Sequence, residues 1–370
     1  MKVGHFTDTY FPQVNGVSYT IKPWKQELER KGVRVMVYFP KGNGYVPQKN
    51  EFPLPAFKFP LYKDYRISIP LGITKLSKDL DLVHIHTQFV MAAAAWHISK
   101  RYNIPKIFTY HTPVEMYNFY FSRNRLISDK LTKLYLNWEN RLLNSCNLVT
   151  VGSNYMKDYL RKKKIKTRID VVPNGIDVKI FKQLNRQKCR KKFGVQSDKV
   201  IGYCGRIGYE KHLEDLINIA PSFEGEILIA GDGPAVEFYK NMAKKYANVR
   251  FLDFIEQKKL PEFYSCLDVF INPSTVETLS LVSIEAMACG VPNVAADALA
   301  LKETIENGKT GFLYRPGNKE ELLKKIKKVY ENREKLAKNC KKRAKLCTYE
   351  KAAKRLLELY EEIYESEFSC

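Results

Sequence analysis

The sequence has no apolar run long enough to cross a membrane. Its most apolar stretch, FVMAAAAW at residues 89–96, is far shorter than the roughly 20 residues that a membrane-spanning helix needs. The amino-terminal MKVGHFTDTYF turns polar at Thr7 and Asp8, which is too early for the apolar region of a signal peptide. We therefore expect a chain that neither spans a membrane nor is exported by this route.

Cysteine pairs are also missing. None of the eight cysteines belongs to a C-x-x-C pair or to a Cys/His cluster at zinc spacing, so the pattern favours a reduced, cytosolic protein. No low-complexity segment interrupts the chain, and its 45% of hydrophobic residues is typical of a globular protein. At 370 residues the chain is longer than one hydrophobic core usually supports, so two domains are expected.

Acidic residues are scarce in the first half of the chain. The formal net charge is +22, and residues 1–190 hold 33 Lys and Arg against 13 Asp and Glu. The rest of the chain holds 29 basic and 27 acidic side chains. This asymmetry points to a polyanionic partner for the first half, either an anionic membrane or a nucleic acid. The alternative is a lysine-rich, soluble surface without such a partner.

Short β-branched runs alternate with amphipathic segments along the chain, which predicts an α/β fold with parallel sheets. Strands are expected in two series, the first at 2–8, 33–40, 82–87, 106–111, 148–153 and 169–173, the second at 200–205, 226–233, 249–254, 268–274, 291–296 and 311–314. Each series predicts one doubly wound, Rossmann-like domain. We place the domains at residues 1–172 and 173–348, and expect a C-terminal helix at 349–370 to pack back on the first domain.

Ligands of open α/β sheets bind beyond the carboxyl ends of the strands, so the turns that follow strands are candidate sites. After the first strand, Gly16 lies at the start of a helix, where a missing Cβ lets a phosphate approach backbone amides. In LIAGDGP, Gly231 and Gly233 make a tight turn that also starts a helix. Read alone, each turn is an ordinary strand–helix junction.

The turn YCGRIGYEKHLED places Arg206 and Lys211 in one short loop before a helix. A planar guanidinium and a mobile ammonium together suit a diphosphate. The loop contains neither G-x-G-x-x-G nor G-x-x-x-x-G-K-[ST], which argues against nicotinamide and P-loop nucleotide chemistry. The alternative for Lys211 is an exposed position on a helix.

The stretch STVETLSLVSIEAMACG, at 274–290, holds two glutamates around an apolar run. We expect Ser280 to be the N-cap of a helix, with Glu277 in the loop before it and Glu285 inside it. The helix start then offers an anion site from the amides of Thr278, Leu279, Ser280 and Leu281. Because carboxylates accept hydrogen bonds well from vicinal hydroxyls, the two glutamates suit a hexose and a ribose. The alternative is a solvated Glu277 and a structural Glu285.

Histidines occur at the ends of two strands of the first series. They are His84 and His86 in DLVHIHTQF and His111 in FTYHTPVEMY. A lone histidine is more often structural. The position of His111 at a strand end favours a role in which its neutral ring orients a sugar hydroxyl or an incoming acceptor.

Taken together, these motifs resemble one family over nearly the whole chain, the retaining glycosyltransferases of family 4. Their GT-B fold consists of two Rossmann-like domains that face a cleft. The matching motifs are Gly16-Val17, YHT at His111, VPNGID at 172–177, GRIGYEK, AGDGP and the pair Glu277 and Glu285. The chain departs from the family at Ser280 and at 298–300, where glycines are frequent, and the bulkier residues are expected to narrow the sugar pocket or shift its loop.

The resemblance implies a role for each candidate. Arg206 and Lys211 would bind the donor diphosphate and stabilise the leaving group, together with helix amides. Glu285 would bind the ribose, and Glu277 the transferred sugar. The remaining candidates are His111, which would contact that sugar from the first domain, Gly16, which would lie against the phosphates, and Gly231 and the amides of residues 278–281 in the donor site. These enzymes typically need no metal, and neither a metal nor another cofactor is expected.

The motifs FTDTYFPQVNGVSYTI and YHTPVEMY resemble members that glycosylate lipids such as diacylglycerol. Residues 117–138 mix aromatic residues and leucines with Arg and Lys, which suits an anionic headgroup layer. The alternative is an amphipathic helix packed on the core.

We therefore expect a cytoplasmic hexosyltransferase, peripheral at the cytoplasmic face of the membrane, that moves sugar from a UDP- or GDP-sugar to a lipid or lipid-linked acceptor. The first alternative keeps the fold and the donor but makes a soluble glycan or another non-lipid molecule the acceptor. The second is a basic nucleic-acid-binding or scaffolding protein without catalysis. It leaves the motifs of the second series unexplained, so a nucleic-acid partner is not expected.

Overall fold

A computed structural model describes residues 1–13, 15–58, 65–113, 115 and 125–368. The chain divides into two compact units, one of residues 1–174 with 349–370 and one of residues 175–348. The boundary at Asn174 and Gly175 lies two residues after the boundary suggested by the sequence. Both units alternate strands and helices, and the predicted α/β class is confirmed.

The first unit is built on a seven-stranded parallel sheet. In sheet order its strands are β3 (Glu51–Leu54), β2 (Arg34–Pro40), β1 (Lys2–Phe6), β6 (Leu82–Ile85), β7 (Lys106–Tyr110), β8 (Leu148–Val151) and β9 (Ile169–Val171). The short β4 (Ala56–Lys58) and β5 (Arg66–Ser68) form a separate antiparallel pair. The sequence did not predict β3, β4 and β5, because they are only three or four residues long and a proline lies within β3. Pro53 is tolerated in β3 because this strand lies at the sheet edge.

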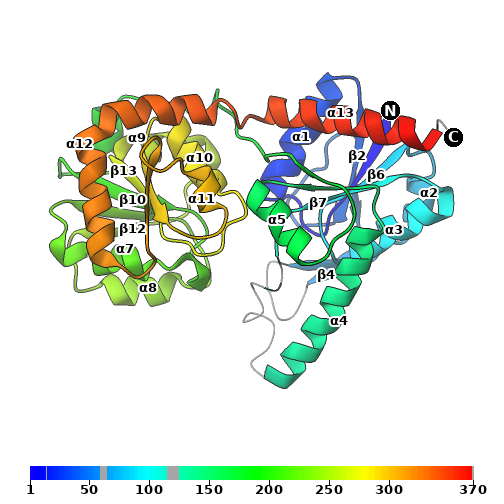
Figure 1. The fold of residues 1–370 in the computed structure, drawn as a ribbon, viewed down its shortest axis with the longest axis horizontal. Helices are drawn as coiled ribbons and strands as arrows, with labels where there is room; N and C mark the ends of the chain where they lie inside the picture. The colour runs from blue at the N-terminus through cyan, green and yellow to red at the C-terminus, as the bar shows by residue number, and fades with distance from the viewer. Residues whose placement is uncertain (14, 59–64, 114, 116–124, 369–370) are drawn as a thin grey trace. The chain divides into compact units, whose positions relative to one another are not determined.

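Helices cover both faces of this sheet (Figure 1). They are α1 (Ser18–Arg30), α2 (Ile73–Leu76), α3 (Val90–Tyr102), α4 (Arg125–Asn144), α5 (Asn154–Lys162) and α13 (Tyr349–Phe368). One apolar layer includes side chains of α3, α4 and α5, and a second layer joins α1 to α13. The C-terminal helix α13 therefore packs against α1 within the first unit, and the side chain of Tyr360 is fully buried there.

The second unit is built on a six-stranded parallel sheet. In sheet order its strands are β12 (Val249–Leu252), β11 (Glu226–Ala230), β10 (Val200–Cys204), β13 (Val269–Asn272), β14 (Asn293–Ala296) and β15 (Gly311–Tyr314). Its helices are α6 (Arg186–Lys192), α7 (Glu214–Asn218), α8 (Val236–Ala243), α9 (Leu260–Cys266), α10 (Leu281–Ala288), α11 (Leu301–Thr304) and α12 (Lys319–Ala344). This order places the topological switch between β10 and β13, where ligands of doubly wound sheets bind.

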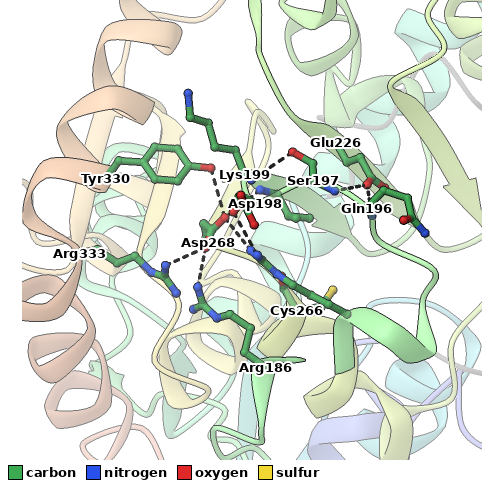
Figure 2. A network of polar contacts seen from close by, with 12 residues as sticks. Arg186, Gln196, Ser197, Asp198, Lys199, Glu226, Cys266, Asp268, Tyr330 and Arg333 are labelled. Atoms are coloured by element: carbon green, nitrogen blue, oxygen red, sulfur yellow. Dashed lines mark hydrogen bonds and ion pairs between the residues drawn. The ribbon is translucent and has the colours of Figure 1, made fainter. Parts of the chain in front are cut away.

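A buried carboxylate, that of Asp268, connects several elements of this unit at the amino-terminal end of β13, opposite to the switch. Asp268 is 1% exposed, and Figure 2 shows its side chain among guanidinium groups. Its Oδ1 lies 2.5 Å from Arg186 and 2.8 Å from Arg333, and its Oδ2 lies 2.9 Å from Arg190. Oδ2 also accepts the backbone N–H of Val200 at 2.8 Å. The carboxylate, which lies directly before β13, thus joins α6, α12 and the first residue of β10, and its charge is compensated despite burial.

The folded units share the positive charge more evenly than the two halves of the sequence do. The first unit has 31 basic and 18 acidic residues, and the second has 31 basic and 22 acidic residues. The difference arises because the basic α6 belongs to the second unit and the glutamate-rich α13 to the first. The strong asymmetry expected from the sequence is therefore a property of the linear chain. Among the described residues, no helix has both the length and the apolarity of a membrane span.

Candidate active site

The sequence candidates of the second unit lie at its topological switch. Arg206 and Lys211 follow β10, and Glu277 follows β13, so they leave the carboxyl ends of two adjacent strands. Lys211 Nζ donates to Glu277 Oε1 at 2.7 Å, and each of the two side chains is 14% exposed. The structure thus brings together a cation and a carboxylate that are 66 positions apart in the sequence.

Arg206 is held by a residue that the sequence reasoning missed. Its guanidinium donates to Glu210 Oε1 at 2.7 Å, and Arg206 is 36% exposed while Glu210 is 2% exposed. Glu210 lies in the 3₁₀ turn Tyr209–Lys211, between the two predicted cations. A half-exposed guanidinium that a buried carboxylate orients is held in a position to present N–H groups to an anion.

The two glycine-containing turns of this unit pack backbone to backbone. Ile207 donates its N–H to Asp232 O at 2.8 Å, and Ala235 donates to Ile207 O at 3.0 Å. A Cβ at Gly231 would lie 1.9 Å from the carbonyl oxygen of Gly205, and one at Gly233 would lie 2.3 Å from that of Ile207. The glycines of AGDGP are therefore required by the packing of the neighbouring loop, and the donor-binding role of Gly231 stays a prediction.

Ser280 is not the side-chain cap that we expected. It precedes α10 with φ +65° and ψ +76°, in the left-handed region, and its hydroxyl makes no hydrogen bond to the helix amides. The hydroxyl instead accepts from Asn272 Nδ2 at 2.8 Å and donates to Ser283 Oγ at 3.0 Å. This conformation explains why glycine is frequent at this position in the family, since a side chain there is strained.

Leu299, at the second departure from the family pattern, is left-handed as well, with φ +41°. Its neighbour Ala300 donates its N–H to Glu277 O at 3.3 Å, and Thr304 Oγ1 donates to Leu279 O at 2.5 Å. The loop that carries Leu299 thus holds the backbone of the loop that carries Glu277. A left-handed backbone conformation costs a non-glycine residue about 1–3 kcal/mol, and such residues cluster at functional sites. Ser280 and Leu299, in adjoining loops, therefore support a functional site at the loop that carries Glu277.

The start of α10 keeps donors available. The amides of Leu281, Val282 and Ser283 lie in the first turn, where an α-helix provides no acceptors of its own. In the part of the chain that the structure describes, no side chain caps them. They face the end of the helix at which the dipole is positive, which suits an anion.

Glu285 lies inside α10 and is 8% exposed. It accepts a hydrogen bond from the hydroxyl of Tyr264 at 2.8 Å. Burial raises the pKa of Glu285 to about 8, and the Tyr264 bond lowers it only in part. The carboxyl group is therefore mostly protonated at neutral pH until a ligand provides further donors.

In the first unit, Gly16 lies just before α1, in the connection that follows β1, and His111 directly follows β7. A Cβ at Gly16 would meet none of the described atoms within 4 Å, so the packing of the described residues does not require a glycine there. Asn15 Oδ1 already accepts from the amides of Val17 and Ser18. His111 Nε2 is 3.1 Å from His86 Nδ1, and burial lowers the pKa of His111 to about 3, which keeps its ring neutral. The contacts of both residues with a donor stay predictions.

Much of the segment expected to contact membrane, 117–138, lies outside the described residues. In its described part, Leu134 is 67% exposed. Tyr135 instead donates to Glu139 at 2.8 Å, and Trp138 Nε1 donates to the carbonyl oxygen of Gln88 at 2.9 Å. This part of α4 therefore contacts the rest of its unit through Trp138, and membrane contact of residues 117–138 stays a prediction.

The sequence reasoning missed Glu210, Tyr264 and Asn272. Asn272 is the last residue of β13, and a polar residue at the end of a buried strand is a signal that could have been used. Glu210 is only four residues from Arg206, so its proximity was a local signal that could have been used. Tyr264 had no such signal, because it contacts Glu285 only through the tertiary fold.

Two family models match the chain. "Glycosyltransferase Family 4" matches residues 14–180, and "Glycosyl transferases group 1" matches residues 185–346. The chain is 32% identical to the alpha-monoglucosyldiacylglycerol synthase of Streptococcus pneumoniae over 335 residues, covering 85% of this chain and 75% of that protein. It is 28% identical to the enzyme of the same name from Acholeplasma laidlawii over 364 residues, covering 90% and 89%.

Solved structures share the fold over the whole chain. Sucrose-phosphate synthase from Thermosynechococcus elongatus aligns with a TM-score of 0.82 at 21% identity, covering 99% of each chain. HepE from Anabaena in complex with UDP aligns with a TM-score of 0.79 at 20% identity, covering 98% of this chain and 99% of that one. With the family models and the first relative, these findings show that the chain belongs to the glycosyltransferases of family 4, enzymes of the GT-B fold.

Proposed function

We propose that the protein transfers a hexosyl unit from a nucleotide-diphosphate sugar to a lipid or lipid-linked acceptor, with retention of the anomeric configuration. The observation that carries the donor half of this proposal is the group formed by Arg206, Lys211 and Glu277 at the switch between β10 and β13. Two cations there suit a diphosphate, and the carboxylate bonded to Lys211 suits the hydroxyls of the sugar.

In this mechanism the side chains and helix amides neutralise the departing nucleoside diphosphate. Arg206 and Lys211 compensate charge that grows as the glycosidic bond breaks, and the amides at the start of α10 add fixed dipoles. Glu277 accepts from the transferred sugar and, through its bond to Lys211, fixes the ammonium near the same ligand. We assign no carboxylate a covalent role, so the acceptor hydroxyl attacks from the side of the leaving group.

The donor is proposed to be a UDP- or GDP-sugar. The complex of HepE with UDP, and the name monoglucosyldiacylglycerol synthase of two relatives, support a UDP-hexose as the first candidate. Glu285 would hold the ribose of this donor, since its buried carboxyl group lies on α10, the helix whose first-turn amides form the anion site.

The lipid acceptor is supported by the two relatives' name and by a surface of the first unit. The segment from β4 to α2 exposes Phe57, Ile69, Leu71 and Leu76, which are 51%, 40%, 71% and 47% exposed. Lys58 and Lys75 are also exposed in this segment, and the exposed Lys78 lies two residues beyond it. Apolar side chains interleaved with lysines suit an anionic lipid surface, so we propose that the enzyme acts at the cytoplasmic face of the membrane.

The donor assignment is tested with the double variant Arg206→Ala/Lys211→Ala. Removal of both cations is expected to weaken UDP-sugar binding and to lower turnover at least a hundredfold, because each charge-assisted hydrogen bond contributes about 1.5–3 kcal/mol. The matched control is Lys192→Ala/Lys199→Ala, which removes two cations from exposed ion pairs of the same unit. If both double variants bound the donor as the native protein does, the donor site would lie elsewhere.

The acceptor is tested by sugar transfer to diacylglycerol in vesicles and to soluble glycans. A lipid acceptor predicts transfer to diacylglycerol, more with anionic than with neutral vesicles, and a loss of vesicle binding in Phe57→Ser/Leu71→Ser. Leu346→Ser, at a residue 56% exposed in the second unit, is the control. Transfer to soluble glycans alone, without vesicle binding, would favour the second candidate, a non-lipid acceptor.

A further inference from the structure

A row of buried polar side chains crosses the first sheet beneath α1 and α13. His5 on β1, His84 on β6, Thr109 on β7 and Thr150 on β8 are each at most 1% exposed. His5 pairs in register with His84, and Thr109 with Thr150. Their apolar neighbours in the strands belong to the opposite layer of the core. Four polar residues on the apolar face of four adjacent strands require partners for their donors and acceptors.

Those partners come from the row itself and from Tyr360 of α13. Thr150 Oγ1 lies 2.6 Å from Thr109 Oγ1, which lies 2.6 Å from His84 Nε2. The Tyr360 hydroxyl lies 2.5 Å from His84 Nδ1 and 3.2 Å from His5 Nε2. The chain then continues through histidine rings only: His5 Nδ1 to His86 Nε2 at 3.1 Å, and His86 Nδ1 to His111 Nε2 at 3.1 Å.

This chain has seven groups, six links and one titratable or hydroxyl proton on each group. Burial lowers the pKa of His84 and His86 well below the ordinary value and that of His5 and His111 to about 3, so all four rings are neutral. A neutral imidazole that accepts at one nitrogen must donate from the other. A hydroxyl of Tyr360 or Thr109 that accepted from both neighbours would leave its own buried proton without an acceptor. We therefore expect all the hydrogen bonds of the chain to point the same way, with one proton left over at one end.

The two ends differ in what a leftover proton would cost. At one end, Thr150 is fully buried, and in the described part of the chain its hydroxyl has no side-chain partner besides Thr109. At the other end, His111 is partly exposed, beyond the end of β7. A buried donor without an acceptor costs about 1–3 kcal/mol, so the leftover proton belongs at His111 Nδ1, where a ligand or water can accept it.

We propose that this chain is a tautomer lock, in which Tyr360, His5 and His86 act as positioning residues that fix His111 as the Nδ1–H tautomer. His111 then presents a hydrogen-bond donor to an oxygen of the substrate, and its Nε2 is occupied by His86. Only the contact of His111 with a substrate rests on the proposed function. The fixed tautomer of His111 follows from the hydrogen bonds of the fold alone. The tautomer lock makes the C-terminal helix part of the site, because Tyr360 is the sole link between the two halves of the chain among the described residues.

Three of these histidines could also be read as a metal site, since ring nitrogens of His5, His84 and His86 lie within 4.8 Å of one another. The hydrogen bonds favour the lock. All six ring nitrogens of these histidines already have a partner in the chain. The face of Trp24 also lies over the group, with its ring centroid 6.4 Å from that of His84 and 6.2 Å from that of His86.

The test is a measurement of the His111 tautomer in the full-length protein by ¹⁵N-histidine NMR, with the signal assigned by its loss in His111→Asn. The native protein is expected to show a protonated Nδ1 and an unprotonated Nε2 at pH 7.5. In Tyr360→Phe the chain is cut, His5 loses its partner at Nε2, and a mixture of both His111 tautomers is expected. Thr150→Val is the matched control, since Thr109 still supplies the proton to His84 and the tautomer is expected to persist.

Activity provides a second readout. If His111 donates to substrate, kcat/KM of Tyr360→Phe falls to the same fraction of native as the Nδ1–H population, while Thr150→Val keeps its native kcat/KM. An Nε2–H or doubly protonated His111 in the native protein, or an unchanged tautomer in Tyr360→Phe at native-like melting temperature, overturns the lock. A stoichiometric zinc in the purified protein, whose removal shifts the His5 and His84 signals, overturns it as well. If the protein showed the expected tautomers but no transferase activity, the proposed function would be wrong and the tautomer lock would still hold.

Discussion

Donor binding is expected to depend on pH through Glu285. The pKa of its buried carboxyl group is raised to about 8, so about nine-tenths of the free protein carries the proton at pH 7. The ionised carboxylate can accept a hydrogen bond from each of two ribose hydroxyls. The protonated carboxyl group accepts less well, because one of its oxygens carries a proton. Binding then favours the carboxylate and releases the proton, and affinity rises with pH until the free protein is itself ionised.

The size of the effect follows from that pKa. If the pKa of Glu285 in the complex lies well below 6.5, the dissociation constant falls about 25-fold between pH 6.5 and pH 8.5, which is about 1.9 kcal/mol. Titration calorimetry with a UDP-sugar in the absence of acceptor measures this slope, and buffers of different ionisation enthalpy give the number of protons released. The expected value is about 0.9 proton at pH 7.

Two variants separate Glu285 from other titrating groups. Glu285→Gln is expected to bind with nearly constant affinity over this range, because its amide cannot release the proton. Tyr264→Phe removes the bond that stabilises the carboxylate, so the rise in affinity should move to higher pH. A flat profile in the native protein, or a native slope in Glu285→Gln, would refute the assignment of Glu285 to the donor hydroxyls.

Three further predictions concern stability. Asp268→Ala leaves three buried or half-buried guanidinium groups without their carboxylate and should lower the unfolding free energy by about 3–5 kcal/mol, measured by urea denaturation, whereas Glu224→Ala, from an exposed pair, should change it little. Leu299→Gly should be about 1 kcal/mol more stable than Leu299→Ala, because only glycine is relaxed at φ +41°; equal stabilities would contradict the strain. The four neutral histidines of the first unit take up protons on unfolding below pH 6.5, so stability should fall as pH drops, by about 1.4 kcal/mol per histidine between pH 7.5 and 5.5. Asp8, whose pKa is raised to about 6, is stabilised in the folded protein by protonation, and this offsets less than the contribution of one histidine. Hydrogen exchange at low pH should show the loss of stability in the first unit before the second.

The order of strands and helices could be read from the sequence with few errors. Alternating β-branched runs and amphipathic segments reflect the repeat of strand and helix geometry, which each segment encodes locally. The predicted strands of both Rossmann-like sheets are present, while the short strands from β3 to β5 were missed. The same local signals located Arg206, Lys211 and Glu277 in turns after strands, because a turn at a strand end has a recognisable pattern.

The tertiary structure decided which groups these residues meet. Nothing in the linear spacing indicates that Lys211 pairs with Glu277 or that Tyr264 reaches Glu285. It also decided that Ser280 adopts a left-handed backbone and leaves the helix amides uncapped, and that the basic half of the sequence does not form a comparably basic unit.

The histidine chain shows the division most clearly. The sequence places each of His5, His84, Thr109 and Thr150 between apolar residues of its own strand. Because successive side chains of a strand point to opposite faces, each polar side chain lies on the face opposite to that of its two neighbours. Only the fold placed those strands side by side and brought Tyr360, more than 200 residues away from Thr150, over the row. Hydrogen bonds require atoms within about 3 Å, and this proximity is set by packing across the whole chain, which no local pattern encodes.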